Sequence, residues 1–152
     1  MKMSAGLAGG IAGTITVASL HEGLRRITPD APRMDLLDIE LIRKGLQLCH
    51  QEIPETRELE RWAVAGELIC DTAYYSLAAV GRKKALWTRG TLLGLFAGIT
   101  AVILPGPLGI SKEPSNKTMA TQLMTIGLYL AGGIVAAAIT KLVDNAQRNV
   151  EH

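Results

Sequence analysis

Hydrophobic residues in this chain are gathered into long, mostly uncharged blocks separated by polar segments. Four of these blocks are long enough for a transmembrane helix, which needs about 20 predominantly apolar residues. The pattern predicts four such helices, over residues 3–24, 60–81, 86–104 and 118–140. It favours an all-α integral membrane protein, a bundle of about four transmembrane helices in which residues 1–152 form a single membrane domain.

The first block admits two interpretations. Residues 3–20 carry no charge, and Lys2 before this run, with Val17-Ala18-Ser19 near its end, also resembles a secretory signal peptide. The run is long enough to cross a bilayer with little tilt. We expect a retained span.

The second block is less apolar than the others and has its own alternative, an amphipathic helix lying on the membrane surface. An interfacial helix usually presents a wide face of Lys and Arg. Between Trp62 and Gly81, however, there are two acids and no base. We therefore expect this block to span, with Trp62 and the bases after Gly81 as interface anchors. In the third block the helix should end near Leu104, because Pro105 disfavours helix at the residue before it.

A polar loop, residues 25–59, separates the first two blocks. Within it Met34, Leu37, Leu41 and Leu48 recur at helical spacing among acids and bases. This periodicity predicts an amphipathic helix in the first loop. Such a helix would lie at the membrane surface or cap the bundle.

The distribution of bases predicts an orientation. All charged residues in the segment 82–89 are bases, whereas the first loop holds more acids than bases. Because short cytoplasmic loops are rich in Lys and Arg, the segment 82–89 and, with four spans, both termini are expected in the cytoplasm of a bacterial inner membrane. Arg25 and Arg26, just behind the first span, weigh against this orientation.

Glycine spacing predicts how the helices pack. The chain has 16 glycines and only 4% aromatic residues, a composition typical of closely packed membrane helices. Glycines four residues apart share one helix face and let two backbones approach. The candidate helix-packing positions are Gly6, Gly10, Gly90, Gly94 and Gly98. The sequence Leu-Ala-Gly-Gly-Ile also occurs twice, at 7–11 and at 130–134, and we attribute it to similar packing demands rather than to a duplication.

Glu67 and Asp71 are the most unusual residues of the chain, because they interrupt an apolar block. An ionisable group at membrane depth costs roughly 2.5–3.5 kcal/mol on insertion scales, so something must offset it. At roughly 100° per residue, Glu67, Asp71 and Tyr74 share one helix face, which should point into the bundle. We identify the two acids as candidate proton or cation ligands. Tyr74 would support them by donating a hydrogen bond to Asp71 or by lining a polar path.

Three structural alternatives for these acids stay open. They could be protonated and hydrogen-bonded between helices. Each such hydrogen bond would stabilise the association of the helices by about 0.6 kcal/mol. They could pair with His21, Arg25 or Arg26. Or the segment does not span and they are solvated.

Other chemistry is not indicated. His21, Glu22, Glu60 and Glu67 lack the spacing of metal ligands, and no nucleophile arrangement is visible, so we expect neither a metal nor a cofactor. A formal charge of +2 does not favour nucleic acid as a partner.

The preferred function is an oligomeric proton- or cation-conducting or transport component, because one small subunit offers few helices to enclose a path. The alternative is a non-catalytic accessory or scaffold subunit of a larger membrane complex. An enzyme acting on lipids, with the two carboxylates as acid and base, ranks below both. The expected partners are the lipid bilayer and either further copies of the chain or another membrane protein.

Overall fold

The computed structural model describes residues 1–150, and within this range it consists of helices and loops only. The elements are α1 (Met3–Ile27), α2 (Met34–Leu48), α3 (Thr56–Ser76), η1 (Leu77–Ala79), η2 (Lys83–Ala85), α4 (Leu86–Ile103), α5 (Glu113–Asn116) and α6 (Met119–Asn149). The all-helical prediction is confirmed. The first loop contains α2, at the position predicted for a helix.

Within residues 1–150, three stretches are long and apolar enough to cross a membrane, namely α1, the segment Lys83–Ile103 and α6. They correspond to the first, third and fourth predicted blocks. α3 is not among them, so the fourth span of the predicted bundle is not confirmed. Its early turns carry Arg57, Glu58, Glu60 and Arg61, which lower its average hydropathy.

The second block also ends earlier than predicted. Its α-helix stops at Ser76 instead of continuing to Gly81, and the chain tightens into η1. Arg89 stabilises this turn, since its guanidinium donates to the carbonyl oxygens of Ala78 (3.0 Å) and Arg82 (2.9 Å). Gly81 then turns the chain with a φ of +94°, a conformation that glycine adopts without strain.

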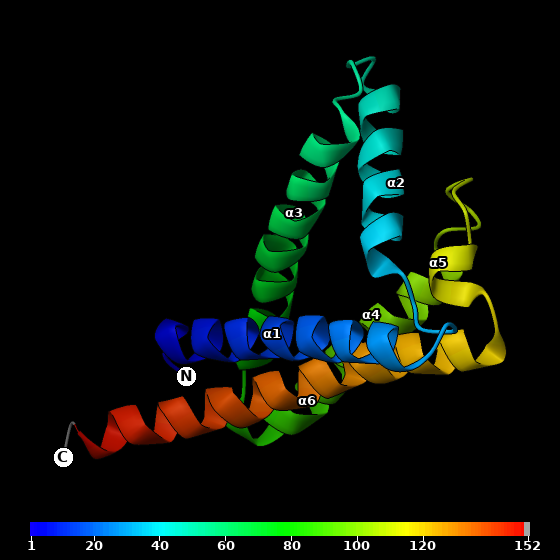
Figure 1. Cartoon of the computed structure of the whole chain (residues 1–152). Coiled ribbons are helices and arrows are strands. Elements are labelled where there is room, and N and C mark those ends of the chain that lie inside the picture. Colours follow the sequence, from blue (N-terminus) through cyan, green and yellow to red (C-terminus); the bar gives the residue numbers. More distant parts are fainter. Residues whose placement is uncertain (151–152) are drawn as a thin grey trace.

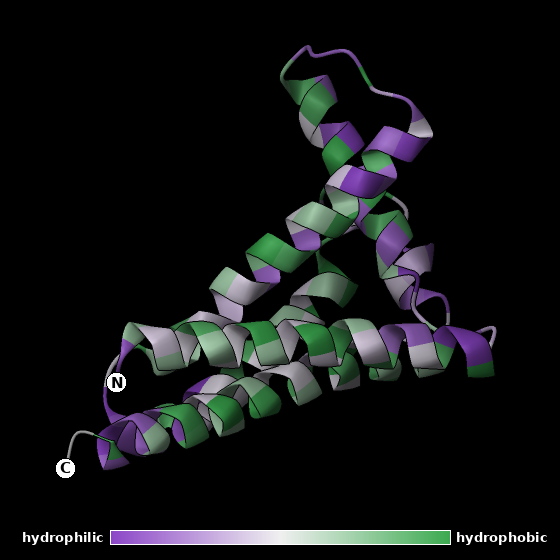
Figure 2. Ribbon diagram, turned by 60° about the vertical axis from the view of Figure 1, so that its left-hand side comes forward, coloured by the Kyte–Doolittle hydropathy of each residue, from purple (hydrophilic) through white to green (hydrophobic). Residues whose placement is uncertain are grey.

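α1, α4 and α6 lie side by side, with α6 between the other two (Figure 1, Figure 2). α6 is antiparallel to both neighbours. A Cβ added to Gly90, early in α4, would lie 2.5 Å from the carbonyl oxygen of Gly133, whereas one on Gly98 would lie 2.6 Å from the Cα of Ile126. α1 and α4 therefore run in the same direction.

The five candidate packing glycines are all buried. Gly90, Gly94 and Gly98 face the backbone of α6. Gly6 and Gly10 face η1 and the end of α3 instead.

The two double glycines explain the repeated sequence. Gly9 faces α6 while its neighbour Gly10 faces α3, and Gly132 faces α1 while Gly133 faces α4. Consecutive residues on a helix point about 100° apart, so a glycine pair lets one helix approach two neighbours at once. α1 and α6 are the two helices that pack between two others, which accounts for the recurrence without a duplication.

The N-terminus, the end of α6 and the segment 80–85 gather at one end of this layer, which we call the terminal end (Figure 1). Asp144 holds them together. Its buried carboxylate accepts the backbone N–H of Lys2 (3.3 Å) and forms ion pairs with Lys83 and with Arg148 (3.3 Å). This relative placement is the one that the predicted orientation requires.

Asp144→Asn should therefore lower the stability of the protein. The substitution keeps the shape of the side chain but removes the buried charge that three donors share. We expect a loss of about 1–3 kcal/mol, measured as a lower melting temperature in mild detergent. An unchanged melting temperature would show that these contacts contribute nothing to the fold.

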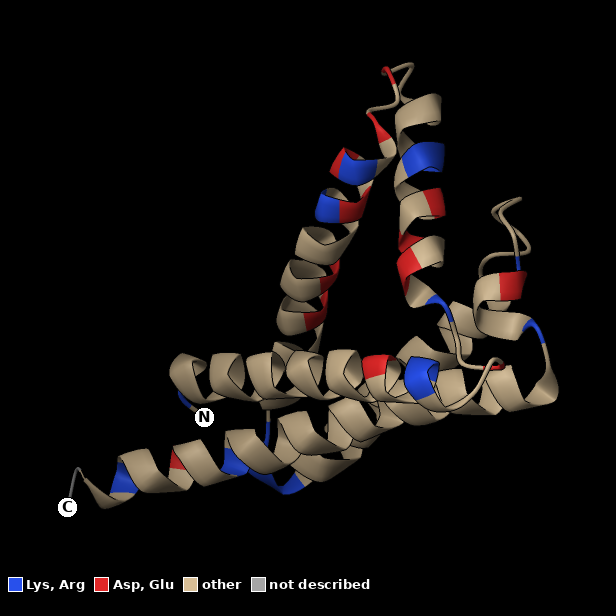
Figure 3. Ribbon diagram, in the orientation of Figure 1, with Lys and Arg blue, Asp and Glu red and all other residues tan. Residues whose placement is uncertain are grey.

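The opposite, distal end of the layer contains the linker 28–33 and the segment 104–118. A hydrogen bond from the Arg33 N–H to the carbonyl oxygen of Pro114 (2.7 Å) joins the two, and Thr121 Oγ1, in the first turn of α6, donates to the carbonyl oxygen of Asp30 (2.8 Å). From this end α2 and α3 form a hairpin that rises away from the layer (Figure 1). Acids and bases occupy much of the outer half of this hairpin (Figure 3).

α3 returns the chain to the layer. It crosses α1 obliquely (Figure 2), with Thr72 Oγ1 donating to Thr14 Oγ1 (3.3 Å). Further on, Tyr75 donates to the carbonyl oxygen of Tyr129 (2.9 Å), and Ala79 reaches Gly6 near the terminal end. Since α1 and α4 run in the same direction, the chain between them must travel back along the layer, and it does so along α3 and η1.

Candidate functional site

The two predicted acids lie where α3 meets the layer, and the structure brings a third carboxylate to them. Glu67 and Asp71 are half-buried on α3. Asp38, on the facing helix α2, is also half-buried. Its burial, together with the negative charges of Glu67 and Asp71, raises the pKa of Asp38 to about 7. The hairpin and the layer thus enclose a region of concentrated negative charge.

Two cavities adjoin these carboxylates. One, of about 170 Å³, has Asp38 among otherwise mostly apolar walls from α2 and the end of α4. The other, of about 340 Å³, is lined by Asp71, Tyr74 and Phe96 among others. Both include Thr100 and Tyr129 in their walls, so they are neighbours. We call Asp38, Glu67, Asp71 and these two cavities the carboxylate crevice.

One carboxylate oxygen in the crevice has no partner. Asp71 Oδ2 is buried and accepts no hydrogen bond from any residue in the range 1–150. A buried acceptor without a donor costs free energy comparable to a lost hydrogen bond. A proton on the carboxyl, a water molecule or a bound cation would each satisfy it.

The sequence predicts either of two roles for Tyr74, a hydrogen bond to Asp71 or the lining of a polar path. The Tyr74 hydroxyl donates its one hydrogen to the carbonyl oxygen of Leu93 in α4, at 2.8 Å, so this hydrogen is not available to Asp71. The predicted hydrogen bond from Tyr74 to Asp71 is wrong, because the approach of α3 to α4 offers the hydroxyl a carbonyl acceptor instead. The Tyr74 side chain does line the cavity beside Asp71.

The bases considered as partners of the acids are occupied elsewhere. Arg25 and Arg26 both pair with Glu22, at 3.7 and 2.8 Å. His21 Nε2 donates to the carbonyl oxygen of Pro32 at 2.7 Å. Among the ion pairs that the described residues form, none includes Glu67 or Asp71.

The crevice is not a preformed metal centre. Throughout residues 1–150, no three side chains of His, Cys, Asp or Glu converge closely enough to hold a metal ion. The walls of its two cavities include Asp38, Asp71, two tyrosines and a threonine, and no Lys or Arg. The arrangement suits groups that exchange protons or attract a cation from water.

Asp38 was missed by the sequence analysis, although a signal existed. It lies on the same side of the α2 helix as Met34 and Leu41, four residues after one and three before the other. A carboxylate on the apolar face of an amphipathic helix costs energy unless something compensates. Tyr129 carried no such signal, since an aromatic residue in an apolar helix is ordinary.

No protein-family model matches the chain, and no curated protein or solved structure is significantly similar to it.

Proposed function

We propose that this protein is an oligomeric membrane component that conducts or transports protons or cations, using Asp71, Glu67 and Asp38. The observation that carries the proposal is the buried, unpartnered Asp71 Oδ2 beside a cavity that holds no Lys or Arg. A merely structural carboxylate would be expected to have found a donor, as Asp144 has. Ionisable groups of this kind in membrane proteins are functional by default.

The proposed topology follows from helix direction. With α1, α4 and α6 crossing the bilayer, the return along α3 and η1 becomes the fourth crossing. We place the terminal end in the cytoplasm of a bacterial inner membrane, because Arg82, Lys83 and Lys84 lie there. Reporter fusions at residue 150 and within the hairpin loop 49–55 would test this, since they should report opposite compartments.

The crevice reaches only part of the way across the layer. Along α4 its cavities extend from Leu104, just past the distal end of the helix, to Phe96 in its second half. A single copy therefore does not enclose a complete path in these two cavities. This favours an assembly in which a further copy continues the path toward the terminal end.

Reconstitution into vesicles tests the function directly. A proton or cation gradient across vesicles that contain the protein should dissipate faster than across empty vesicles. Asp71→Asn should reduce this flux by about tenfold or more, as removal of a proton-accepting group from a relay does. Glu58→Gln, an exposed acid on the same helix, serves as the control and should leave the flux unchanged.

Two outcomes would contradict the proposal. If flux is absent from the wild type, or if Asp71→Asn and Glu58→Gln behave alike while both remain folded, the carboxylates do not carry ions.

An accessory or scaffold role is the second candidate. It is supported by apolar side chains that α3 leaves uncovered, with Ile69 70% and Val64 55% exposed. Such residues face either lipid or another protein. Purification from native membranes in mild detergent separates the candidates, because a transport component should form a defined homo-oligomer and an accessory subunit should copurify with a different protein.

A further inference from the structure

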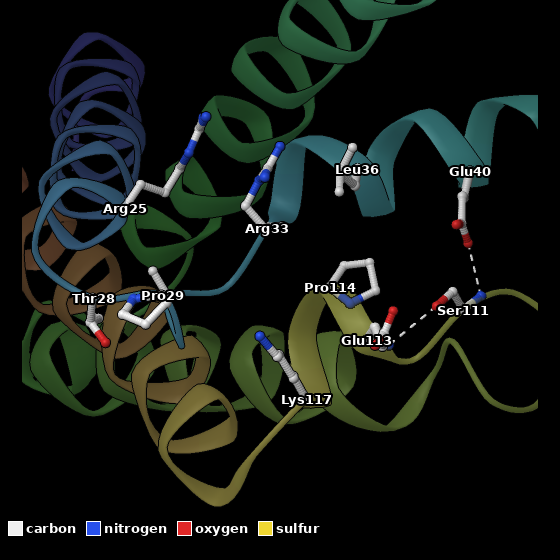
Figure 4. A pocket seen from close by; sticks show the side chains of 11 residues that line it. Arg25, Thr28, Pro29, Arg33, Leu36, Glu40, Ser111, Glu113, Pro114 and Lys117 are labelled. Carbon is white, nitrogen blue, oxygen red and sulfur yellow. Dashed lines mark hydrogen bonds between the residues drawn. The ribbon is translucent and has the colours of Figure 1, made fainter.

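A second charged cavity lies at the distal end, apart from the carboxylate crevice. It has a volume of about 450 Å³ and lies between the end of α1, the start of α2 and the segment 111–117 (Figure 4). Its charged lining residues are Arg25, Arg33, Glu40, Glu113 and Lys117. We call it the distal cleft.

The two signs of charge occupy different sides of the distal cleft. Figure 4 shows Arg25 and Arg33 together on one side and Glu40 with Glu113 on the other. Lys117 extends into the space between them. The cleft is therefore dipolar, basic at one side and acidic at the other.

Part of this charge is already neutralised and part is not. Arg25 and Arg33 share the carboxylate of Asp35, at 3.8 and 2.9 Å, and Arg25 also pairs with Glu22 at 3.7 Å. Glu40 accepts the backbone N–H of Ser111 at 2.8 Å, which joins α2 to the far wall.

The side chains of Lys117 and Glu113 are the available pair. Within residues 1–150 neither forms an ion pair or a side-chain hydrogen bond. Both extend from the segment 113–117, which forms one wall of the cleft (Figure 4), and one is able to bind an anion and the other a cation.

The position of the cleft restricts its ligand. It lies beside the last turn of α1 and the chain leading into α6, where the lipid headgroups would be if these helices cross a bilayer. A zwitterion whose two charges are a few bonds apart would meet both sides at once. Phosphate suits the basic side, since Arg and Lys bind it by charge-assisted hydrogen bonds.

We propose that the distal cleft binds a zwitterionic phosphodiester that carries a primary amine, as in a phosphoethanolamine headgroup. The phosphate lies against Lys117, on the side of the cleft that Arg25 and Arg33 make basic, and the ammonium group lies against Glu113 and Glu40. A primary ammonium is favoured over choline because no aromatic side chain lines the cleft. Recognition of quaternary ammonium groups generally uses aromatic rings. The proposal rests on the membrane placement of the three apolar helices and not on the carboxylate crevice.

Native mass spectrometry of the purified full chain in mild detergent tests this inference. The protein is titrated with phosphatidylethanolamine, phosphatidylcholine and phosphatidylglycerol that carry identical acyl chains. Phosphatidylethanolamine should bind about tenfold more tightly than the other two, the ratio expected for one additional charged hydrogen bond. The proposal is overturned if phosphatidylglycerol binds as tightly as phosphatidylethanolamine or more tightly, because the cleft would then recognise only the negative charge of the phosphate.

Two variants separate the two sides of the cleft. Lys117→Gln should weaken phosphatidylethanolamine and phosphatidylglycerol alike. Glu113→Gln should weaken only phosphatidylethanolamine and remove the preference. Lys112→Gln, an exposed base of the same segment outside the cleft, is the matched control and should change neither. If Glu113→Gln leaves the preference intact while its melting temperature equals that of the wild type, the assignment of the ammonium site is wrong.

Soluble glycerophosphoethanolamine identifies the source of the ligand. Competition with the lipid at similar concentration indicates that the headgroup suffices and that a water-soluble phosphodiester can occupy the cleft. Competition only at much higher concentration indicates a membrane lipid. Either result supports the headgroup chemistry, whereas failure to compete at any concentration overturns it.

Discussion

Asp38→Asn should weaken the dependence of stability on pH between about 4 and 7. In the wild type the pKa of Asp38 rises from its ordinary 3.8 to about 7, because burial and two nearby acids disfavour its ionised form. Between these values the folded protein holds a proton that the unfolded chain has released. The contribution of Asp38 to stability therefore falls as pH rises through this window, by at most about 4 kcal/mol, and is constant above it.

Melting temperatures in mild detergent from pH 4.5 to 8 would measure this effect. The wild type should melt highest at acidic pH, and Asp38→Asn should show a shallower profile, because Glu67 and Asp71 remain in the crevice. At pH 8 the variant should be the more stable protein, because asparagine carries no charge to bury. The control Glu58→Gln, exposed in the hairpin, should follow the wild-type profile. A wild-type profile that rises toward pH 8 would contradict the packing of α2 against α3.

Gly133→Ala should be among the most destabilising single substitutions in the chain. The added methyl group would lie 2.9 Å from the backbone nitrogen and 3.0 Å from the Cα of Gly94, with the Gly90 carbonyl oxygen closer still. These are backbone atoms, so α4 and α6 must move apart along their contact. Overpacking of this kind costs about 1–3 kcal/mol and occasionally more.

The same helix offers a matched control. Gly127 has nothing within 4 Å of the position that its Cβ would occupy. Gly127→Ala should therefore raise stability by about 0.5–1 kcal/mol, because alanine loses less conformational freedom in a helix. If both variants melt at the same temperature, the glycine contact between α4 and α6 is not close in the folded protein.

The apolar helices could be predicted from sequence because their signal is local. α1, α4 and α6 begin and end within a few residues of the predicted positions, except that α6 continues to Asn149 rather than 140. The sequence suggested an end there because Lys141 and Asp144 interrupt the apolar run. In the structure Asp144 is buried by contacts with Lys2 and Lys83, which are remote in the sequence.

The candidate site could be predicted only in part, because some of its contacts join residues that are remote in the sequence. The shared face of Glu67 and Asp71 follows from helix geometry alone. The approach of Asp38 depends on how the hairpin closes, and the bond from Tyr74 to Leu93 depends on where α3 meets α4. Neither is encoded in the spacing of residues along one helix.

The central position of α6 has a consequence for biogenesis. α1 and α4 both precede α6 in the chain, so both leave the ribosome before the helix that lies between them. Until α6 arrives, the glycine faces of Gly9 and Gly90 have no helix to contact. The layer is therefore completed by insertion of a late helix between two earlier ones. A nascent chain stalled before residue 119 would leave both glycine faces uncovered.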